Sequence, residues 1–212
     1  MKLVLIGAPA AGKGTQARKL ISKYALAYIA TGDMLREEVS KETELGLKVK
    51  SIMTSGSLVP DETIIAIVKE RIKADDCKNG FILDGFPRTV VQGKKLDEII
   101  GGIDKAIYVN APDEVMLARI TARSTCPKCG ASYNKTTIRP KIDGICDTCG
   151  DALVQRKDDT LEAGKARLKT FHDQSEPLVA YYDVQGKLLD VDGLLDPNEL
   201  FKLIVKELGE GA

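Results

Sequence analysis

The feature that most constrains the fold is a glycine-rich stretch near the N-terminus that includes Lys13. Residues 3–6, just before it, are all apolar and predict a buried parallel strand, and the residues after it, through about Tyr24, predict a helix. Together, the strand, the glycine-rich turn and the start of the helix are typical of a phosphate-binding site. The N–H groups of such a loop point inward, and the lysine reaches the outer phosphates of a nucleotide. A turn that only packs the helix on the strand is the alternative, but it does not explain the lysine. We expect phosphate to be held by Gly7, Ala8, Pro9, Ala10, Ala11, Gly12, Lys13, Gly14 and Thr15.

The loop departs from the commonest phosphate-binding pattern at one position. Gly14 stands where Ser or Thr usually follows the lysine, and the hydroxyl comes one residue later, at Thr15. A hydroxyl group is therefore still present, shifted by one residue.

The composition excludes several classes of protein. The chain has 212 residues, which suits one α/β domain with insertions, and its 31 basic and 31 acidic residues leave no net charge to attract nucleic acid or an anionic membrane. No apolar run approaches the length of a membrane span, and the N-terminal run is too short for a signal peptide. We expect a cytoplasmic protein that binds neither nucleic acid nor membrane and, without a long amphipathic seam, is a monomer.

Strands alternate with helices along the chain. Apolar runs predict four strands in addition to the first, at residues 25–30, 80–84, 105–109 and 187–191. This alternation predicts an α/β fold with a parallel sheet and helices on both faces. Two segments interrupt the pattern: a helical insertion at residues 30–59 and a polar, cysteine-rich insertion at residues 124–158.

Local signals mark the expected ends of the helices. Thr31 is a good N-cap type for the helix that follows it, and Asp196 begins the last helix with a similar signal. A long helical segment is expected from about Asp159 until Gly186 breaks it. We expect the last few residues of the chain to be frayed.

Six arginines lie near strand ends, on helices beside an insertion, or at insertion boundaries. Any one of them is more commonly an exposed surface residue, but the set suits the charges of a nucleoside triphosphate and a monophosphate, because a guanidinium binds two phosphate oxygens at once. Two of them, four residues apart after the strand at 105–109, are expected to share one helix face. The six are Arg36, Arg88, Arg119, Arg123, Arg156 and Arg167.

Asp84 ends the apolar strand at 80–84. Carboxyl ends of parallel strands face one crevice, so we expect its carboxylate to lie in the same layer as Lys13 and to handle Mg²⁺ beside the phosphates. The alternative is a turn cap in front of Gly85. His172 is the only histidine and no general base stands beside the phosphate loop, which suits a phosphate acceptor that is already ionised at neutral pH.

The cysteines form two closely spaced pairs. Cys126, Cys129, Cys146 and Cys149 have the spacing C-x2-C-x16-C-x2-C, which predicts a four-thiolate zinc site. With four protein ligands the site is closed, so zinc would stabilise the insertion without taking part in chemistry. Two disulfides or four free thiols are the alternatives. Cys77 stands apart and is expected to be inert.

Taken together, the chain resembles the adenylate kinase family over its whole length. The resemblance rests on residues 7–15, 31–36, 58–61 and 84–89, Gln92, Arg119, Arg123, the cysteine segment and residues 156–159. It implies a phosphate-loop core made of residues 1–29, 60–122 and 160–212. It also implies an insertion at residues 30–59 that binds the nucleoside monophosphate, and a zinc-ribbon-like lid at residues 123–159 over the triphosphate.

The resemblance also implies a reaction, the reversible transfer of a phosphoryl group from Mg·ATP to AMP to give two ADP. AMP would be held by Thr31, Arg36, Ser57, Leu58, Val59, Gly85, Phe86, Pro87, Arg88, Gln92, Arg156 and Arg167, with Gln92 at the adenine edge. ATP would be held by the phosphate loop with Arg119 and Arg123. Catalysis would rest on Lys13, Asp84, Arg88, Arg123, Arg156 and Arg167, with Asp158 and Asp159 supporting Mg²⁺ or closure of the lid.

Three positions depart from the family pattern. Ala10 replaces a glycine, Phe171 a tyrosine, and Asn134 the histidine that commonly follows the lid tyrosine. A methyl group at Ala10 is tolerated if the φ angle there is negative.

Two alternative functions remain open at this point. The first is a related nucleoside monophosphate kinase that uses another base. The second is a nucleotide switch whose zinc ribbon binds nucleic acid. Against the second, the segment from Cys126 to Cys149 has few basic residues and a single aromatic one, Tyr133.

Overall fold

A five-stranded parallel sheet forms the centre of the molecule. The computed structural model describes residues 1–209; of the last few residues, which we expected to be frayed, 210–212 lie outside this range. The strand order is β2-β3-β1-β4-β7, and every neighbouring pair is parallel. The strands are β1 (Lys2–Ile6), β2 (Ala27–Ala30), β3 (Phe81–Asp84), β4 (Lys105–Asn110) and β7 (Leu188–Asp192).

The predicted α/β fold is therefore confirmed. The central strand β1 is buried from Leu3 to Ile6, in agreement with its unbroken apolar run. The predicted strand at 25–30 starts two residues late, because Ala25 has a φ of 52° and ends the preceding helix in the left-handed region.

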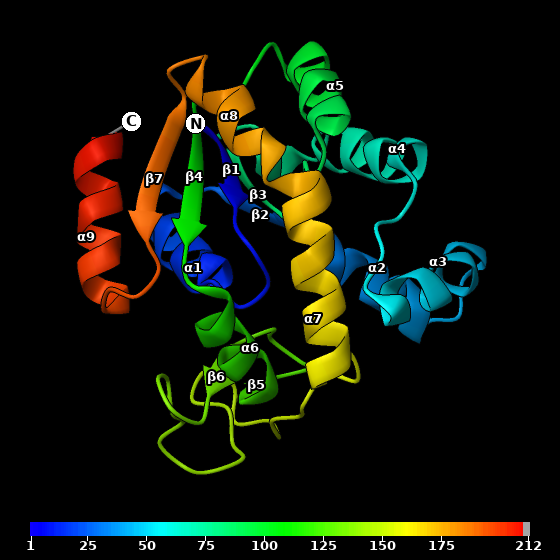
Figure 1. Ribbon diagram of the computed structural model, residues 1–212, viewed down its shortest axis with the longest axis vertical. Helices are drawn as coiled ribbons and strands as arrows, with labels where there is room; N and C mark the ends of the chain where they lie inside the picture. Colours follow the sequence, from blue (N-terminus) through cyan, green and yellow to red (C-terminus); the bar gives the residue numbers. More distant parts are fainter. Residues whose placement is uncertain (210–212) are drawn as a thin grey trace.

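Helices cover both faces of this sheet (Figure 1). Helix α1 packs against β1 and β3, and α9 packs against α1, while α5 packs against α8. The core helices are α1 (Lys13–Tyr24), α4 (Asp61–Arg71), α5 (Val90–Ile100), α6 (Asp113–Thr121), α7 (Leu161–Thr170), α8 (Pro177–Asp183) and α9 (Pro197–Leu208), with a 3-10 turn at Asp75–Cys77.

The long helical segment expected from Asp159 to Gly186 is not one regular helix. Helix α7 begins after Thr160, whose side chain accepts a hydrogen bond from the N–H of Ala163. A π-helical turn at Phe171–Ser175 then separates it from α8. At the last helix the predicted cap is confirmed, since the Asp196 carboxylate accepts a hydrogen bond from the N–H of Asn198 at 2.8 Å.

Two helices, α2 (Thr31–Ser40) and α3 (Glu44–Ser55), form the insertion that follows β2. The expectation that Thr31 caps α2 is wrong. The strand runs directly into the helix, so Ala30 occupies the N-cap position and Thr31 is already helical and buried. The Thr31 hydroxyl instead donates a hydrogen bond to the carbonyl oxygen of Gly85 at 2.9 Å.

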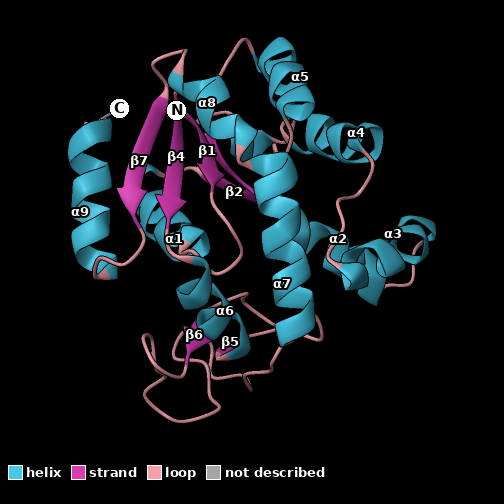
Figure 2. Cartoon of the chain, viewed as in Figure 1, coloured by secondary structure: helices cyan, strands magenta, loops and turns pink. Residues whose placement is uncertain are grey.

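The cysteine-rich segment lies beyond the carboxyl ends of the sheet strands, and loops make up most of it (Figure 2). It contains a short antiparallel pair, β5 (Arg123–Thr125) and β6 (Ser132–Asn134), and a small core of its own made of Cys126, Ala131, Tyr133 and Cys146. Within residues 1–209, the structure contains no helix with the length and apolar character that a membrane crossing requires.

The prediction that Arg119 and Arg123 share one helix face is wrong. Helix α6 ends at Thr121, and Ala122 closes it, so Arg123 is the first residue of β5. Arg119 donates to the carbonyl oxygen of Gly193 at 3.0 Å, whereas Arg123 forms an ion pair with Asp159.

Candidate active site

The glycine-rich loop connects β1 to α1 and folds back on itself. Gly7 has a φ of 146°, and a Cβ there would lie 2.5 Å from the Val109 carbonyl oxygen, so only glycine fits between the loop and β4. The Lys13 ammonium group donates hydrogen bonds to the carbonyl oxygens of Gly7 at 2.7 Å and Ala8 at 2.9 Å. The loop thus forms a compact cradle with the lysine at its centre, as phosphate binding requires.

Ala10 lies in this loop with a φ of 63°. The methyl group was expected to be tolerated on condition of a negative φ, and the structure does not meet that condition. An L-residue in the left-handed region brings its Cβ close to a carbonyl oxygen, so the loop contains local backbone strain that glycine would not have.

A cavity of about 710 Å³ lies in front of the loop. Asp84 at the end of β3 lines it together with Lys13 and Thr15, as expected from the strand order. Burial lowers the pKa of Lys13 to about 8; the charge of Asp84 raises it, and the charges of Arg88 and other arginines lower it. Negative charge on a ligand in this cavity would favour the ammonium form.

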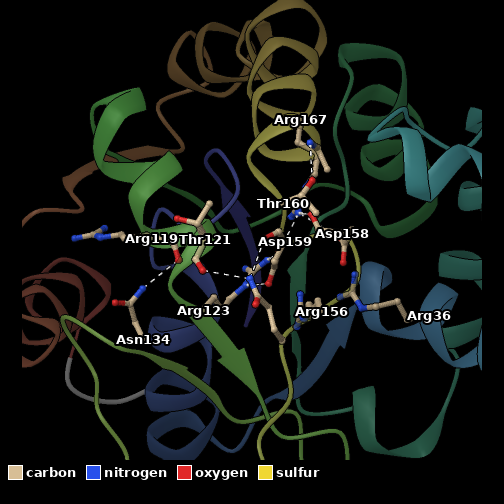
Figure 3. Close-up of polar contacts among 12 residues, drawn as sticks. Arg36, Arg119, Thr121, Arg123, Asn134, Arg156, Asp158, Asp159, Thr160 and Arg167 are labelled. Carbon is tan, nitrogen blue, oxygen red and sulfur yellow. Dashed lines mark hydrogen bonds and ion pairs between the residues drawn. The ribbon is translucent and has the colours of Figure 1, made fainter.

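The six predicted arginines come to this cavity from different parts of the chain. Figure 3 shows Arg36 of α2 and Arg156 close together, with Arg123 and Arg167 nearby, while Arg119 lies to one side. Burial and the neighbouring cations lower the pKa values of Arg88 and Arg156 to about 10 each, which leaves both charged at neutral pH. This concentration of buried positive charge suits a polyanionic ligand. All six arginines line the cavity.

Carboxylates hold three of these arginines in place. Asp159 has a completely buried side chain that accepts hydrogen bonds from Arg123 and also pairs with Arg167 at 3.4 Å. Arg167 also contacts the Asp158 carboxylate at 3.2 Å and donates to its carbonyl oxygen at 3.3 Å. Arg156 pairs with Asp33 at 3.4 Å. Asp158 and Asp159 thus pair with arginines; that they support Mg²⁺ or closure of the lid stays a prediction.

Sequence reasoning missed Asp33. Its carboxylate lies between Arg36 and Arg156, and so connects the helical insertion to the cysteine-rich segment. Burial acts to raise the pKa of Asp33, but the charge and hydrogen bond of Arg36 outweigh it, so the pKa lies below its usual value. The pair of Asp33 and Arg36 could have been found from the sequence, because residues three positions apart on a helix lie side by side.

A second, smaller cavity of about 70 Å³ lies beside the first, between α2, α3 and the loop after β3. Most of the residues expected to hold AMP line it. They are Thr31, Arg36, Ser57, Leu58, Val59, Gly85, Arg88, Gln92 and Arg167. Pro87 and Arg156 line the larger cavity, whereas Phe86 is buried in the core and, like Ala8 of the phosphate loop, lines neither of these two cavities.

Gln92 is held by hydrogen bonds at both ends of its amide. Its Nε2 donates to the Asp61 carboxylate at 2.6 Å, and its Oε1 accepts from the backbone N–H of Arg88 at 2.7 Å. One amide N–H and one lone pair remain for a ligand. That Gln92 reads the adenine edge stays a prediction.

The structure brings the four paired cysteines together. Their sulfur atoms all lie within 4.8 Å of one another. Tetrahedral Zn–S bonds of 2.3 Å would separate the sulfurs by about 3.8 Å, so the cluster fits a structural zinc ion. Cys126 and Cys149 are 3.4 Å apart and Cys129 and Cys146 3.5 Å apart, too far for an S–S bond of about 2.05 Å. The disulfide alternative therefore does not describe this structure.

Two groups of cavity-lining residues were not expected from the sequence. Leu194 and Leu195 follow the carboxyl end of β7, where ligands of parallel sheets bind, so the strand pattern alone was a signal for them. No comparable signal existed for the residues of the cysteine-rich segment that line the cavity, because this segment has no regular periodicity. Besides its predicted arginines, these are Gly130, Ser132, Tyr133, Asn134, Thr137 and Ile138.

The family model for adenylate kinase matches residues 5–187 of the chain. The chain belongs to the adenylate kinase family. A protein from Clostridium acetobutylicum named adenylate kinase is 49% identical over 214 residues, which cover 99% of this chain and 100% of that protein. One of the same name from Clostridium tetani is 48% identical, and one from Caldicellulosiruptor saccharolyticus 47%, each over 99% of both chains.

Membership in the adenylate kinase family confirms the resemblance drawn from the sequence motifs and makes the chain a phosphotransferase. The alternative of a nucleotide switch with a nucleic-acid-binding ribbon has no support in these comparisons.

Proposed function

We propose that this chain transfers the γ-phosphoryl group of Mg·ATP to AMP, reversibly, to give two ADP. The observation that carries the proposal is that Arg36, Arg88 and Arg167 line both cavities. Arginines at the junction of a donor site and an acceptor site contact the group in transfer, whichever way the reaction runs.

The proposed roles of the residues follow from their places. Lys13 and the loop N–H groups bind the outer phosphates of ATP, and Arg88 with Arg36 orients the phosphate of AMP in line with them. Arg123, Arg156 and Arg167 stabilise the charge that is spread over the phosphoryl oxygens in a loose transition state. No side chain needs to act as a base, because the acceptor phosphate is already ionised.

Asp84 is an oxygen ligand in the same cavity as Lys13 and Thr15, which fits the preference of Mg²⁺ for carboxylate and hydroxyl oxygens. Asp84 would hold the ion, which would supply positive charge to offset that of the phosphates. The residues of the chain contribute the rest: they place donor and acceptor and keep water away from the phosphoryl group.

The proposed domains are a core of residues 1–29, 60–122 and 160–212, an AMP-binding insertion at 30–59, and a lid at 123–159. The ion pair between Arg156 and Asp33 joins the lid to the AMP-binding insertion across the cavity, which supports closure over the substrates. We also infer a cytoplasmic monomer, and because the chain has no net charge, one without a nucleic-acid or membrane partner.

A phosphoryl-transfer assay tests the proposal. The protein is given Mg·ATP with AMP, UMP, CMP, GMP or no acceptor, and the nucleotide products are separated and quantified. We expect rapid ADP formation with AMP only. Preferred turnover with another monophosphate would change the proposed acceptor, and hydrolysis of ATP at a rate independent of any acceptor would refute the proposal.

A further inference from the structure

Tyr28 on β2 contacts the carboxylate for which we proposed Mg²⁺ binding. Its hydroxyl group donates a hydrogen bond to Oδ2 of Asp84 at 2.9 Å. The strand register explains the contact: Ala30 pairs with Asp84, and Tyr28, two residues earlier, lies on the same face of the sheet. A tyrosine side chain is long enough to reach a diagonal neighbour on the adjacent strand.

The pair lies against the phosphate loop. Tyr28 and Asp84 both line the large cavity, and a Cβ on Gly14 would be 3.8 Å from the Tyr28 hydroxyl and from Asp84 Oδ2. The two side chains therefore pack on the first turn of α1, directly after Lys13. Gly14 is the position at which the loop departs from the commonest pattern.

Asp84 differs from the other carboxylates of the site in that no salt bridge compensates its charge within residues 1–209. Asp33 and Asp159 each pair with two arginines, so their charge is compensated within the protein. Within residues 1–209, Asp84 forms no salt bridge, and its Oδ1 accepts no hydrogen bond from a protein group. A neutral phenol orients a carboxylate but leaves its full negative charge for a cation.

We propose that Tyr28 is a positioning residue for metal binding: its hydroxyl fixes the Asp84 carboxylate through Oδ2 so that Oδ1 faces the cation of the Mg·nucleotide. The inference rests on the proposed use of Mg·ATP and adds a residue that acts through Asp84 rather than on the substrates.

The test measures metal binding apart from turnover. The protein is saturated with an ATP analogue in which an NH group replaces the β–γ bridging oxygen. Mn²⁺ binding is then followed from the EPR signal of free Mn²⁺. Mutation of a residue that hydrogen-bonds to a metal ligand typically lowers metal affinity 10- to 100-fold. We therefore expect Tyr28→Phe to weaken Mn²⁺ binding about tenfold. Affinity for the analogue without metal should stay within about twofold, since a uniform loss would indicate a damaged site.

Tyr181→Phe is the matched control. It removes the same hydroxyl from another tyrosine–aspartate hydrogen bond, that of Tyr181 to Asp97 at 2.7 Å, and neither residue lines the two cavities described above. It should leave Mn²⁺ affinity unchanged. Equal weakening in both variants, or no weakening in Tyr28→Phe, would overturn the proposal.

The Asp84→Asn background gives a second, independent test. If Tyr28 acts through the Asp84 carboxylate, Tyr28→Phe should have no further effect on Mn²⁺ binding in that background, and additive losses would contradict this. The assay with the unaltered protein separates the two proposals. Transfer from Mg·ATP with no effect of Tyr28→Phe on Mn²⁺ binding refutes only the role of Tyr28, whereas absence of transfer refutes the proposed function.

Discussion

Replacing Ala10 with glycine should stabilise the protein. The φ of 63° places Ala10 in the left-handed region, which costs an L-residue about 1–2 kcal/mol. Glycine adopts this conformation without strain, but its greater conformational freedom in the unfolded chain lowers the free energy of unfolding by about 0.5–1 kcal/mol. The net expected gain in the free energy of unfolding is about 0.5–1 kcal/mol. For a chain of this length, that raises the melting temperature by roughly 1–4 °C.

Thermal and urea unfolding followed by circular dichroism would measure this gain. Ala25→Gly is a positive control, because exposed Ala25 has a φ of 52° at the end of α1 and should gain a similar amount. Ala180→Gly is the opposite control: exposed and inside α8, it should lose about 1 kcal/mol. If Ala10→Gly destabilised the protein as Ala180→Gly does, the reasoning from backbone strain would be refuted.

Three further predictions concern the acceptor site, the lid and pH. Arg88→Ala should weaken AMP binding at least tenfold with ATP binding nearly intact, because a charge-assisted hydrogen bond to phosphate is lost; equal losses in calorimetry would contradict the assignment. Removing zinc with a chelator should lower the melting temperature and increase proteolysis within residues 123–159 before activity at low temperature disappears; metal analysis that finds no zinc would contradict this. Hydrogen bonds to Glu176 and Asp113 raise the pKa of His172 in the folded protein. The stabilisation by His172 should therefore be complete below about pH 6.5 and lost as the pH rises through the raised pKa. A difference in melting temperature between wild type and His172→Ala that stays constant across this range would be evidence against this prediction.

The sheet was predictable because its central strands β1, β3 and β4 are buried on both faces. Such strands are continuous apolar runs, and all five predicted strands occur, displaced at their ends by no more than two residues. Helix ends were less predictable where two elements join without a loop. At Thr31 the residue type indicated a cap, but β2 enters α2 directly, so the side chain bonds to Gly85 instead.

The local parts of the site could also be predicted from the sequence. A phosphate loop and a four-cysteine cluster each depend on residues within one short segment, so their spacing carries the information; even Cys126 and Cys149 are only 23 positions apart. The arginines were recognised as a set, but their partners were not, because Arg156 and Asp33 are 123 residues apart in the chain. Only the folded structure shows which carboxylate compensates which arginine.

Compensation of charge explains how one cavity can attract both a cation and a polyanion. Asp159 and Asp33 hold arginines in place without removing the positive excess, because each carboxylate is shared by two guanidinium groups. Within residues 1–209, Asp84 is shared by no pair of arginines: its charge acts on Lys13 and Arg88 without a salt bridge, and its carboxylate accepts a hydrogen bond from the neutral Tyr28 hydroxyl. We therefore infer a separation of charges in the proposed site: the cationic side chains serve the phosphates, and the Asp84 carboxylate serves the metal. A mutation that gave Asp84 a cationic partner in place of Tyr28 should then weaken metal binding more than removal of the hydroxyl does.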